Sequence, residues 1–109
     1  MMTTLPLGIE YEGRLQREYA LRLPVIGDTI EAVNAIARAG GNTDSLLEVQ
    51  IGILSRCLTR LGDIPAEVRD YAWLRANLPD EDFEVLWAEL DDLKKKRREQ
   101  KPAPAASAS

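Results

Sequence analysis

The sequence contains no histidine and only one cysteine, and both scarcities limit the chemistry that the chain can perform. Without histidine it lacks the side chain that most often exchanges protons near neutral pH and most often binds metal ions. A single cysteine cannot form a disulfide within the chain, which is typical of a reducing compartment. This residue, Cys57, lies at helical spacing from Ile53, Leu54 and Leu61. We therefore interpret it as a small buried side chain and not as a nucleophile.

Motifs of catalysis and of membrane insertion are missing as well. The sequence has no glycine-rich phosphate-binding loop, no nucleophile elbow and no residues with metal-ligand spacing. We expect a protein that is not an enzyme and that binds no cofactor and no metal. No apolar run approaches the roughly 20 residues that cross a bilayer, and the first residues lack the pattern of a signal peptide. These features predict a cytoplasmic protein without membrane contact.

The composition is that of an ordinary globular protein, with 45% hydrophobic and 29% charged residues in a chain of 109. A chain of this length is typical of one domain. The net charge of −4 disfavours binding of the whole molecule to nucleic acid or to anionic membranes. The sequence thus favours an acidic domain that functions by binding another protein.

Apolar and polar side chains alternate over most of residues 5–23, as in β-strands with one buried face. Gly13 separates two such segments, so we predict a β-hairpin over residues 4–23. The first strand would bury its odd-numbered apolar residues, which are Leu5, Leu7, Ile9 and Tyr11. A lone hairpin is marginal in water, so its apolar face must pack on helices or on a second copy.

The loop of the hairpin has two alternatives. The second strand carries its own apolar residues, which are Leu15, Tyr19, Leu21 and Leu23. A two-residue turn would pair Ile9 with Gln16 and place the apolar residues of the two strands on opposite faces of the hairpin. A three-residue loop, Glu12–Arg14, pairs Tyr11 with Leu15 and keeps both sets together. We predict the three-residue loop because it gives the hairpin one continuous apolar face.

Helical spacing follows the hairpin. Asp28 and Ser45 each have a glutamate three residues later, the spacing of a capping box, so we predict both as N-caps, with Thr43 or Asp44 as alternatives to Ser45. The first helix would bury a stripe formed by Ile30, Val33, Ile36 and Ala37. The second is apolar around much of its circumference and should form the core. Glycine and proline signals place the helices at about residues 28–39, 46–61, 65–78 and 81–100, with Asp80 as the cap of the last.

The predicted fold class is therefore α+β and mostly α. An N-terminal β-hairpin packs on a bundle of about four helices, the last of which is long. We place a single domain at residues 1–101, with the hairpin at 4–23 and the helices within 28–101. Residues 102–109 contain only proline, alanine and serine, which predicts a disordered tail.

The last helix carries a narrow apolar seam at three- and four-residue spacing, formed by Phe83, Leu86, Trp87, Leu90 and Leu93. One interpretation is a helix that packs this seam on its own domain, stabilised by acids near its start and bases near its end. The other is that the seam binds a partner helix or a second copy, because no apolar residue follows Leu93 within the helix. In that case Trp87→Ala or Leu90→Asp should weaken partner binding and leave the fold largely intact.

A basic run, Lys94–Arg98, also lies in this helix. It contains no aromatic residue and directly follows acids that repel phosphate, so we do not expect nucleic-acid binding.

The order of these parts resembles that of the tail assembly chaperones of contractile- and siphophage-type viruses, especially those of Mu-like transposable phages and prophages. The resemblance covers about residues 5–98. It is carried by a strand that leads directly into a capped helix, by an apolar helix and by a short segment before the closing helices, which are Arg17–Pro24, Gln50–Leu58 and Leu61–Pro65.

The resemblance implies a protein that binds the long helical tape measure protein, keeps it soluble and helps to recruit tail tube protein. Such chaperones work in the host cytoplasm and are not part of the mature virion. The family often makes a longer product by a programmed −1 frameshift, for which the codons of Lys94–Lys96 are a candidate site. Two alternatives remain open, a minor structural or connector protein of the virion and a small DNA-binding regulator.

Overall fold

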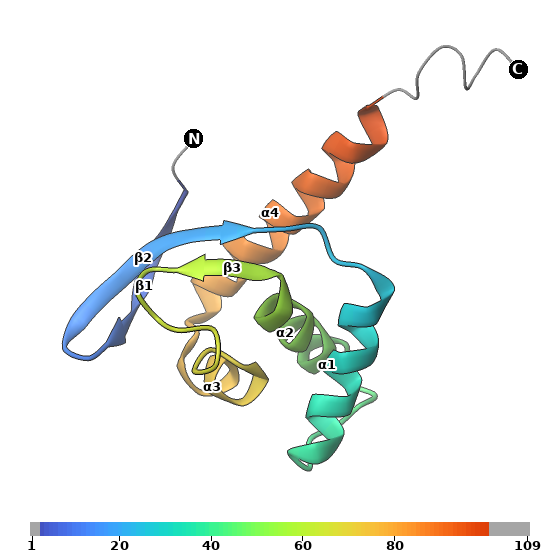
Figure 1. Ribbon diagram of the computed structural model, residues 1–109, viewed down its shortest axis with the longest axis horizontal. Coiled ribbons are helices and arrows are strands. Elements are labelled where there is room, and N and C mark those ends of the chain that lie inside the picture. Colours follow the sequence, from blue (N-terminus) through green and yellow to red (C-terminus); the bar gives the residue numbers. More distant parts are fainter. Residues whose placement is uncertain (1–2, 101–109) are drawn as a thin grey trace, which may run out of the picture.

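The computed structural model describes residues 3–100, in which three β-strands lie beside four helices (Figure 1). In chain order the elements are β1 (Thr4–Tyr11), β2 (Arg14–Leu21), α1 (Ile26–Arg38), α2 (Leu46–Cys57), β3 (Leu58–Leu61), α3 (Tyr71–Asn77) and α4 (Asp80–Glu99). The predicted α+β class is confirmed, with a hairpin packed on four helices and a long C-terminal helix. The predicted tail at 102–109 lies outside the described residues.

The hairpin turns through two residues, Glu12 and Gly13, so the predicted three-residue loop is wrong. Tyr11 pairs with Arg14, and the turn residues have positive φ angles of 51° and 79°, as in a type I′ turn. This turn suits the twist of the strands. A three-residue loop would keep the apolar residues on one face only if the register were regular along the whole hairpin, and in the structure it shifts between Thr4 and Ile9.

A bulge in β1 changes which side chains face the core. The register shifts near Gly8, whose φ of 83° favours glycine. Leu5 and Ile9 are buried, whereas Leu7, which we predicted on the same face, is 47% exposed. The irregular backbone thus separates residues that strict alternation would keep together.

Asp82, in the first turn of α4, binds this bulge. Its buried carboxylate accepts hydrogen bonds from the backbone N–H of Leu7 at 2.9 Å and of Gly8 at 2.8 Å. In a regular strand successive N–H groups point to opposite sides, so one carboxylate can accept from two neighbours only where the strand is distorted. The contact fixes α4 against β1, which is an edge strand of the sheet.

The chain leaves the helical path after Cys57, so the predicted extension of the second helix to residue 61 is wrong. Residues 58–61 form β3, which pairs antiparallel with β2 and places Leu61 opposite Tyr19. Leu58 and Leu61 are buried at a spacing of three residues, which imitates a helix. In the strand this spacing arises because the register shifts and leaves Thr59 without a partner on β2.

A buried arginine holds the outer edge of β3. The guanidinium of Arg69, a side chain that is 6% exposed, donates to the carbonyl oxygens of Leu58 at 2.7 Å, Thr59 at 3.3 Å and Ile64 at 3.2 Å. Two of these carbonyls belong to consecutive residues of the irregular strand. One charged side chain therefore binds each edge of the sheet. Asp82 of α4 binds β1, and Arg69, from the loop before α3, binds β3.

Two of the predicted N-caps lie inside their helices. Val25 is the N-cap of α1, and Asp28 is its third residue, with a carboxylate that accepts from the Val25 N–H at 2.8 Å. Pro79 is the N-cap of α4, with Asp80 in the first turn. In both helices the acid lies where it also meets the positive end of the helix dipole.

The middle helices have side-chain caps. Ser45 is confirmed as the cap of α2, because its Oγ accepts from the Glu48 N–H at 3.3 Å. The Glu48 carboxylate does not return to Ser45 but accepts hydrogen bonds from Tyr71 and Arg75, which joins α2 to α3. Helix α3 begins at Tyr71 with Asp70 as its cap, several residues after Pro65.

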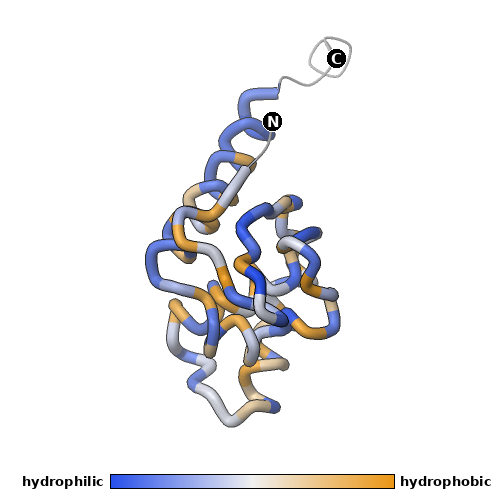
Figure 2. The backbone as a smooth tube through the Cα atoms, turned by 90° about the vertical axis from the view of Figure 1, so that its left-hand side faces the viewer, coloured by the Kyte–Doolittle hydropathy of each residue, from blue (hydrophilic) through white to orange (hydrophobic). Residues whose placement is uncertain are grey.

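The core lies between the hairpin, α2 and α4, and its fully buried leucines include Leu54, Leu86 and Leu90. The distal half of α4 projects from this body (Figure 1), and hydropathy along the backbone is low over that projecting part (Figure 2). Within residues 3–100 no helix has both the length and the hydropathy to span a membrane.

Asp82→Asn tests the contact that fixes α4 to the sheet. Asparagine keeps one acceptor but turns an NH₂ donor toward a backbone N–H, so we expect a loss of about 2–3 kcal/mol in the free energy of unfolding. Urea unfolding followed by circular dichroism measures it. The control Asp80→Asn, at an exposed position of the same turn, should cost about 0.5 kcal/mol. Equal losses would contradict a specific role of Asp82.

Candidate functional site

The predicted partner-binding seam of α4 divides into a buried and a half-buried part. Leu86 and Leu90 are 0% exposed and belong to the core, whereas Phe83, Trp87 and Leu93 lie half-buried at its border. A partner therefore meets only the second set while the domain is folded. Leu90→Asp would place an unpaired charge among core leucines, so it is not the surface change that we expected.

The exposed part of this seam is small, and only charged residues follow it along α4 to Glu99. The rings of Phe83 and Trp87 are stacked with centroids 6.3 Å apart, and the Lys94 ammonium lies 5.6 Å from the Trp87 ring centroid. From Lys95 to Glu99 every side chain is exposed. The projecting end of α4 thus offers positive charge to a partner but no apolar contact.

Helices α1 and α2 form an antiparallel pair in very close contact. The start of α1 is joined to the end of α2, because the Asp28 carboxylate accepts from Arg56 Nε at 3.0 Å. Midway along the pair, a Cβ added to Gly52 would lie 2.6 Å from the Cβ of Ala32. Small side chains at this point let the two backbones approach each other. The pair therefore has two sides, one on each side of the contact between Ala32 and Gly52, and these form two different surfaces.

One side of the pair is apolar. Val33 and Ile53 each follow a residue of the close contact by one position, and in antiparallel helices this places both on the same side. In α1, Ile26 and Ile30 share the helical face of Val33, and in α2, Leu46 and Val49 share that of Ile53, because they lie three, four or seven residues away. We call this surface the α1–α2 apolar face, and its residues are Ile26, Ile30, Val33, Leu46, Val49 and Ile53.

Much of the α1–α2 apolar face is open to solvent. Ile26 is 76%, Leu46 72% and Ile30 54% exposed, which are large values for aliphatic side chains. The first helix was predicted to bury Ile30, Val33, Ile36 and Ala37, but only Ile36 of these is buried. The prediction was wrong because it chose the larger aliphatic residues for the core, whereas the close contact is made by Ala32.

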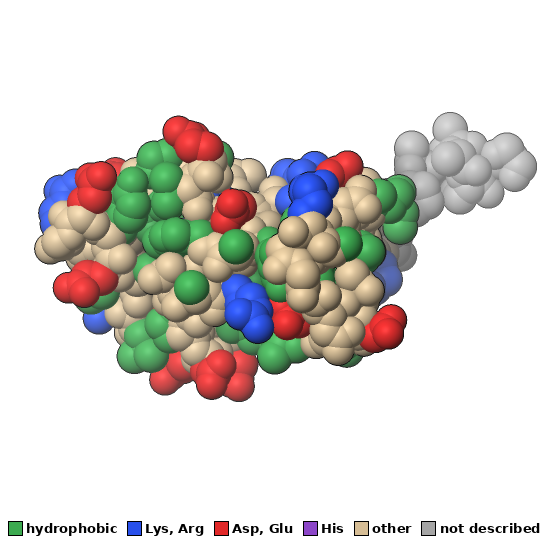
Figure 3. Space-filling view, turned by 90° about the horizontal axis from the view of Figure 1, so that it is seen from below, with side chains coloured by type: hydrophobic (Ala, Val, Ile, Leu, Met, Phe, Trp, Pro, Cys, Tyr) green, Lys and Arg blue, Asp and Glu red, His purple; other side chains and the backbone are tan. Residues whose placement is uncertain are grey.

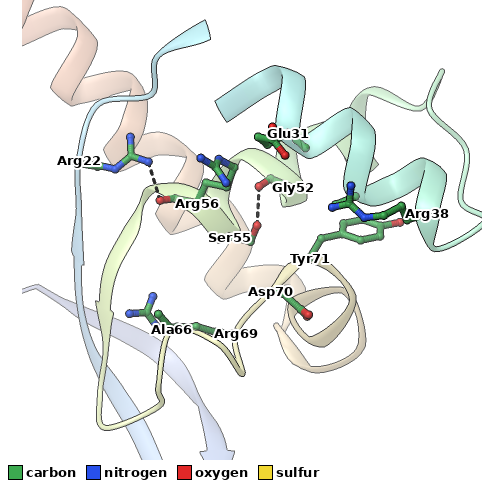
Figure 4. A pocket seen from close by; sticks show the side chains of 12 residues that line it. Arg22, Glu31, Arg38, Gly52, Ser55, Arg56, Ala66, Arg69, Asp70 and Tyr71 are labelled. Atoms are coloured by element: carbon green, nitrogen blue, oxygen red, sulfur yellow. Dashed lines mark hydrogen bonds between the residues drawn. The ribbon is translucent and has the colours of Figure 1, made fainter. Parts of the chain in front are cut away.

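The other side of the pair holds a pocket of about 320 Å³ that is rich in arginine (Figure 4). The space exists because the residues of both helices and of the segment before α3 that face it are small, and charged side chains surround it. The four arginines of its lining are Arg22, Arg38, Arg56 and Arg69, and the acids are Glu31 and Asp70. No group of three or more potential metal ligands occurs in residues 3–100.

Asp28 binds two of the arginines that line this pocket. Its side chain is 1% exposed and accepts two hydrogen bonds of 2.8 Å from the guanidinium of Arg22 and one from Arg56. The hydrogen bonds from Arg22 hold the pKa of Asp28 well below its usual range; burial opposes this effect, and the Val25 N–H and Arg56 reinforce it. The single negative charge of Asp28 thus balances only one of the two positive charges of Arg22 and Arg56.

Cys57 lies beside this ion-pair cluster and is 0% exposed, as the sequence predicted. Burial raises the pKa of its thiol to about 11, and the neighbouring charge of Asp28 acts in the same direction. The residue is therefore a protonated, buried thiol at neutral pH.

Seen from below, hydrophobic side chains lie in several patches, with charged side chains scattered among them (Figure 3). Comparison of this chain with models of protein families, with curated proteins and with solved structures found no match.

Asp28 should make folding stability depend on pH in a defined window. Its pKa is lowered in the folded state, so its contribution is present above the unfolded value of about 4 and is lost as the pH falls further. Asp28→Asn should cost about 2 kcal/mol at pH 7. The difference between the two proteins in urea unfolding should shrink from pH 5 to pH 2.5. A constant difference, or an equal loss for the exposed control Asp44→Asn, would contradict this.

The thiol of Cys57 should resist modification until the protein unfolds. At pH 8, a pKa near 11 leaves a thiolate fraction on the order of a hundredfold below that of a free cysteine, and burial slows access further. Reaction with a chromogenic disulfide reagent should therefore be slow in buffer and fast in urea. Rapid labelling of the folded protein would show that this part of the core is open.

Proposed function

We propose that this protein is a phage tail assembly chaperone of the Mu-like type, which binds the tape measure protein and helps to recruit tail tube protein in the host cytoplasm. The observation that carries the proposal is the α1–α2 apolar face, where three aliphatic side chains are more than half exposed. Exposed aliphatic side chains along one side of a helix pair are typical of a site of protein–protein contact. The resemblance in the order of elements supplies the identity of the partner.

The geometry suits a helical partner. Two antiparallel helices that present aliphatic side chains on one side form a shallow surface on which a third amphipathic helix can lay its own apolar stripe. A tape measure protein, long and largely helical, exposes such stripes before the tube surrounds it. Covering them by many copies of a small acidic protein, with a net charge of −4, would keep the complex soluble.

The half-buried residues of the α4 seam, Phe83, Trp87 and Leu93, would provide a second contact with the partner. Trp87 stays half-buried at the border of the core, and large aromatic side chains are favoured anchors in interfaces. The projecting basic end of α4 adds positive charge near this anchor. It would attract an acidic segment of the partner or of tail tube protein.

The proposal is tested by affinity capture of the tagged chain from cells that express the complete phage late operon, with bound proteins identified by mass spectrometry. We expect recovery of the tape measure protein. The double variant Ile30→Glu with Leu46→Glu should lower its recovery at least about tenfold, because both charges would be desolvated in the complex. Peptides that continue past Lys96 in −1 frame would reveal the longer product.

A matched control is available on the hairpin. Leu15 is 53% exposed and lies outside the α1–α2 apolar face, so Leu15→Glu should leave recovery within about twofold of the unchanged protein. Equal loss with both variants would refute the assigned surface. Recovery of only mature tail components, together with presence in purified virions, would support a structural protein instead. Affinity for DNA that falls steeply with salt would support a regulator.

A further inference from the structure

The arginine-rich pocket has an excess of positive charge in an otherwise acidic protein. Its lining carries four arginines against two acids, and Asp28 beneath it neutralises one more positive charge. The site therefore keeps about one net positive charge, whereas the whole chain has a net charge of −4. Local charge of the opposite sign to that of the molecule is a feature of sites that bind charged ligands.

Two of these arginines have no carboxylate partner among the residues that the structure describes. Arg69 is 6% exposed, and all its hydrogen bonds go to backbone carbonyl oxygens, which are neutral. Burial accordingly lowers the pKa of this guanidinium, and the charge of Glu67 opposes this effect. Arg38, at the end of α1, is exposed and forms no ion pair within residues 3–100.

The shape of the pocket suits a small group and not a large one. Alanine and glycine form much of its wall, and its volume of about 320 Å³ holds a side chain or a small molecule. Figure 4 shows Arg22 and Arg56 on one side of the space and Arg38 with Tyr71 on the other. Arg22 and Arg56 already bind Asp28, whereas Arg38 forms no ion pair within residues 3–100, so a carboxylate would bind at the Arg38 end of the space.

We propose that this pocket binds a carboxylate group, supplied either by an acidic side chain of a polypeptide or by a free small carboxylic acid. A guanidinium is complementary to a planar carboxylate, because both can form two parallel hydrogen bonds. The single net positive charge matches one carboxylate. The two acids of the lining disfavour a doubly charged phosphate. The pocket lies on the opposite side of the α1–α2 pair from the apolar face, so the inference does not depend on the proposed function.

The test is a titration of the full ¹⁵N-labelled chain, followed by amide chemical shifts at constant ionic strength. The probes are sodium acetate and a capped five-residue peptide with glutamate between alanines, compared with the same peptide containing glutamine. Both carboxylates should shift amides of the pocket lining, among them Ala35, Arg38, Ser55 and Tyr71, with a dissociation constant on the order of 1 mM. The glutamine peptide should not.

The outcomes separate the two sources and the alternatives. Tighter binding of the glutamate peptide than of acetate would assign the site to an acidic side chain, and equal binding would assign it to a free acid. Shifts caused equally by the glutamine peptide, stronger shifts with inorganic phosphate, or no saturable shift with either carboxylate would overturn the proposal.

Two variants locate the effect. Arg38→Gln removes an exposed side chain without an ion pair, so the fold should survive, and we expect about tenfold weaker binding of the glutamate peptide. Arg98→Gln removes the same charge from the projecting end of α4 and should leave affinity within about twofold. Equal weakening by both would mean that general charge attraction, and not the pocket, holds the peptide.

Discussion

Both surfaces of the α1–α2 pair depend on the contacts that Asp28 makes with Arg22 and Arg56. The carboxylate joins the end of β2, the start of α1 and the end of α2, and thereby fixes how the two helices face each other. With that orientation set, the aliphatic residues of both helices point to one side and the arginines to the other. A buried carboxylate is costly without partners, so the arrangement is stable only when both arginines are present.

The sheet is attached to the helices by the same kind of interaction. Asp82 accepts from two successive backbone N–H groups of β1, and Arg69 donates to two successive carbonyls of β3. Each charged group binds two successive residues of a strand at the point where its register shifts. The irregularities are thus binding sites for side chains, which satisfies groups that a short three-stranded sheet would otherwise leave without partners.

The sequence was sufficient for the fold class and for the order of the hairpin and the four helices, because apolar spacing and turn residues are local signals. The hairpin, the Ser45 cap and the long last helix follow from such signals. What failed depends on distant contacts. The bulge at Gly8 depends on Asp82, which in sequence is one of several acids at the start of a helix, and β3 imitates helical spacing. The exposed side of α1 could be found only once Ala32 was seen against Gly52.

The two occupied edges have a consequence for how copies of this protein can assemble. An exposed edge strand invites another chain to continue the sheet, and that mode of growth has no natural end. Here two backbone N–H groups of β1 are already bound by Asp82, and two carbonyl groups of β3 by Arg69. If copies gather along one partner as we propose, the occupied groups on each edge would disfavour pairing between their strands.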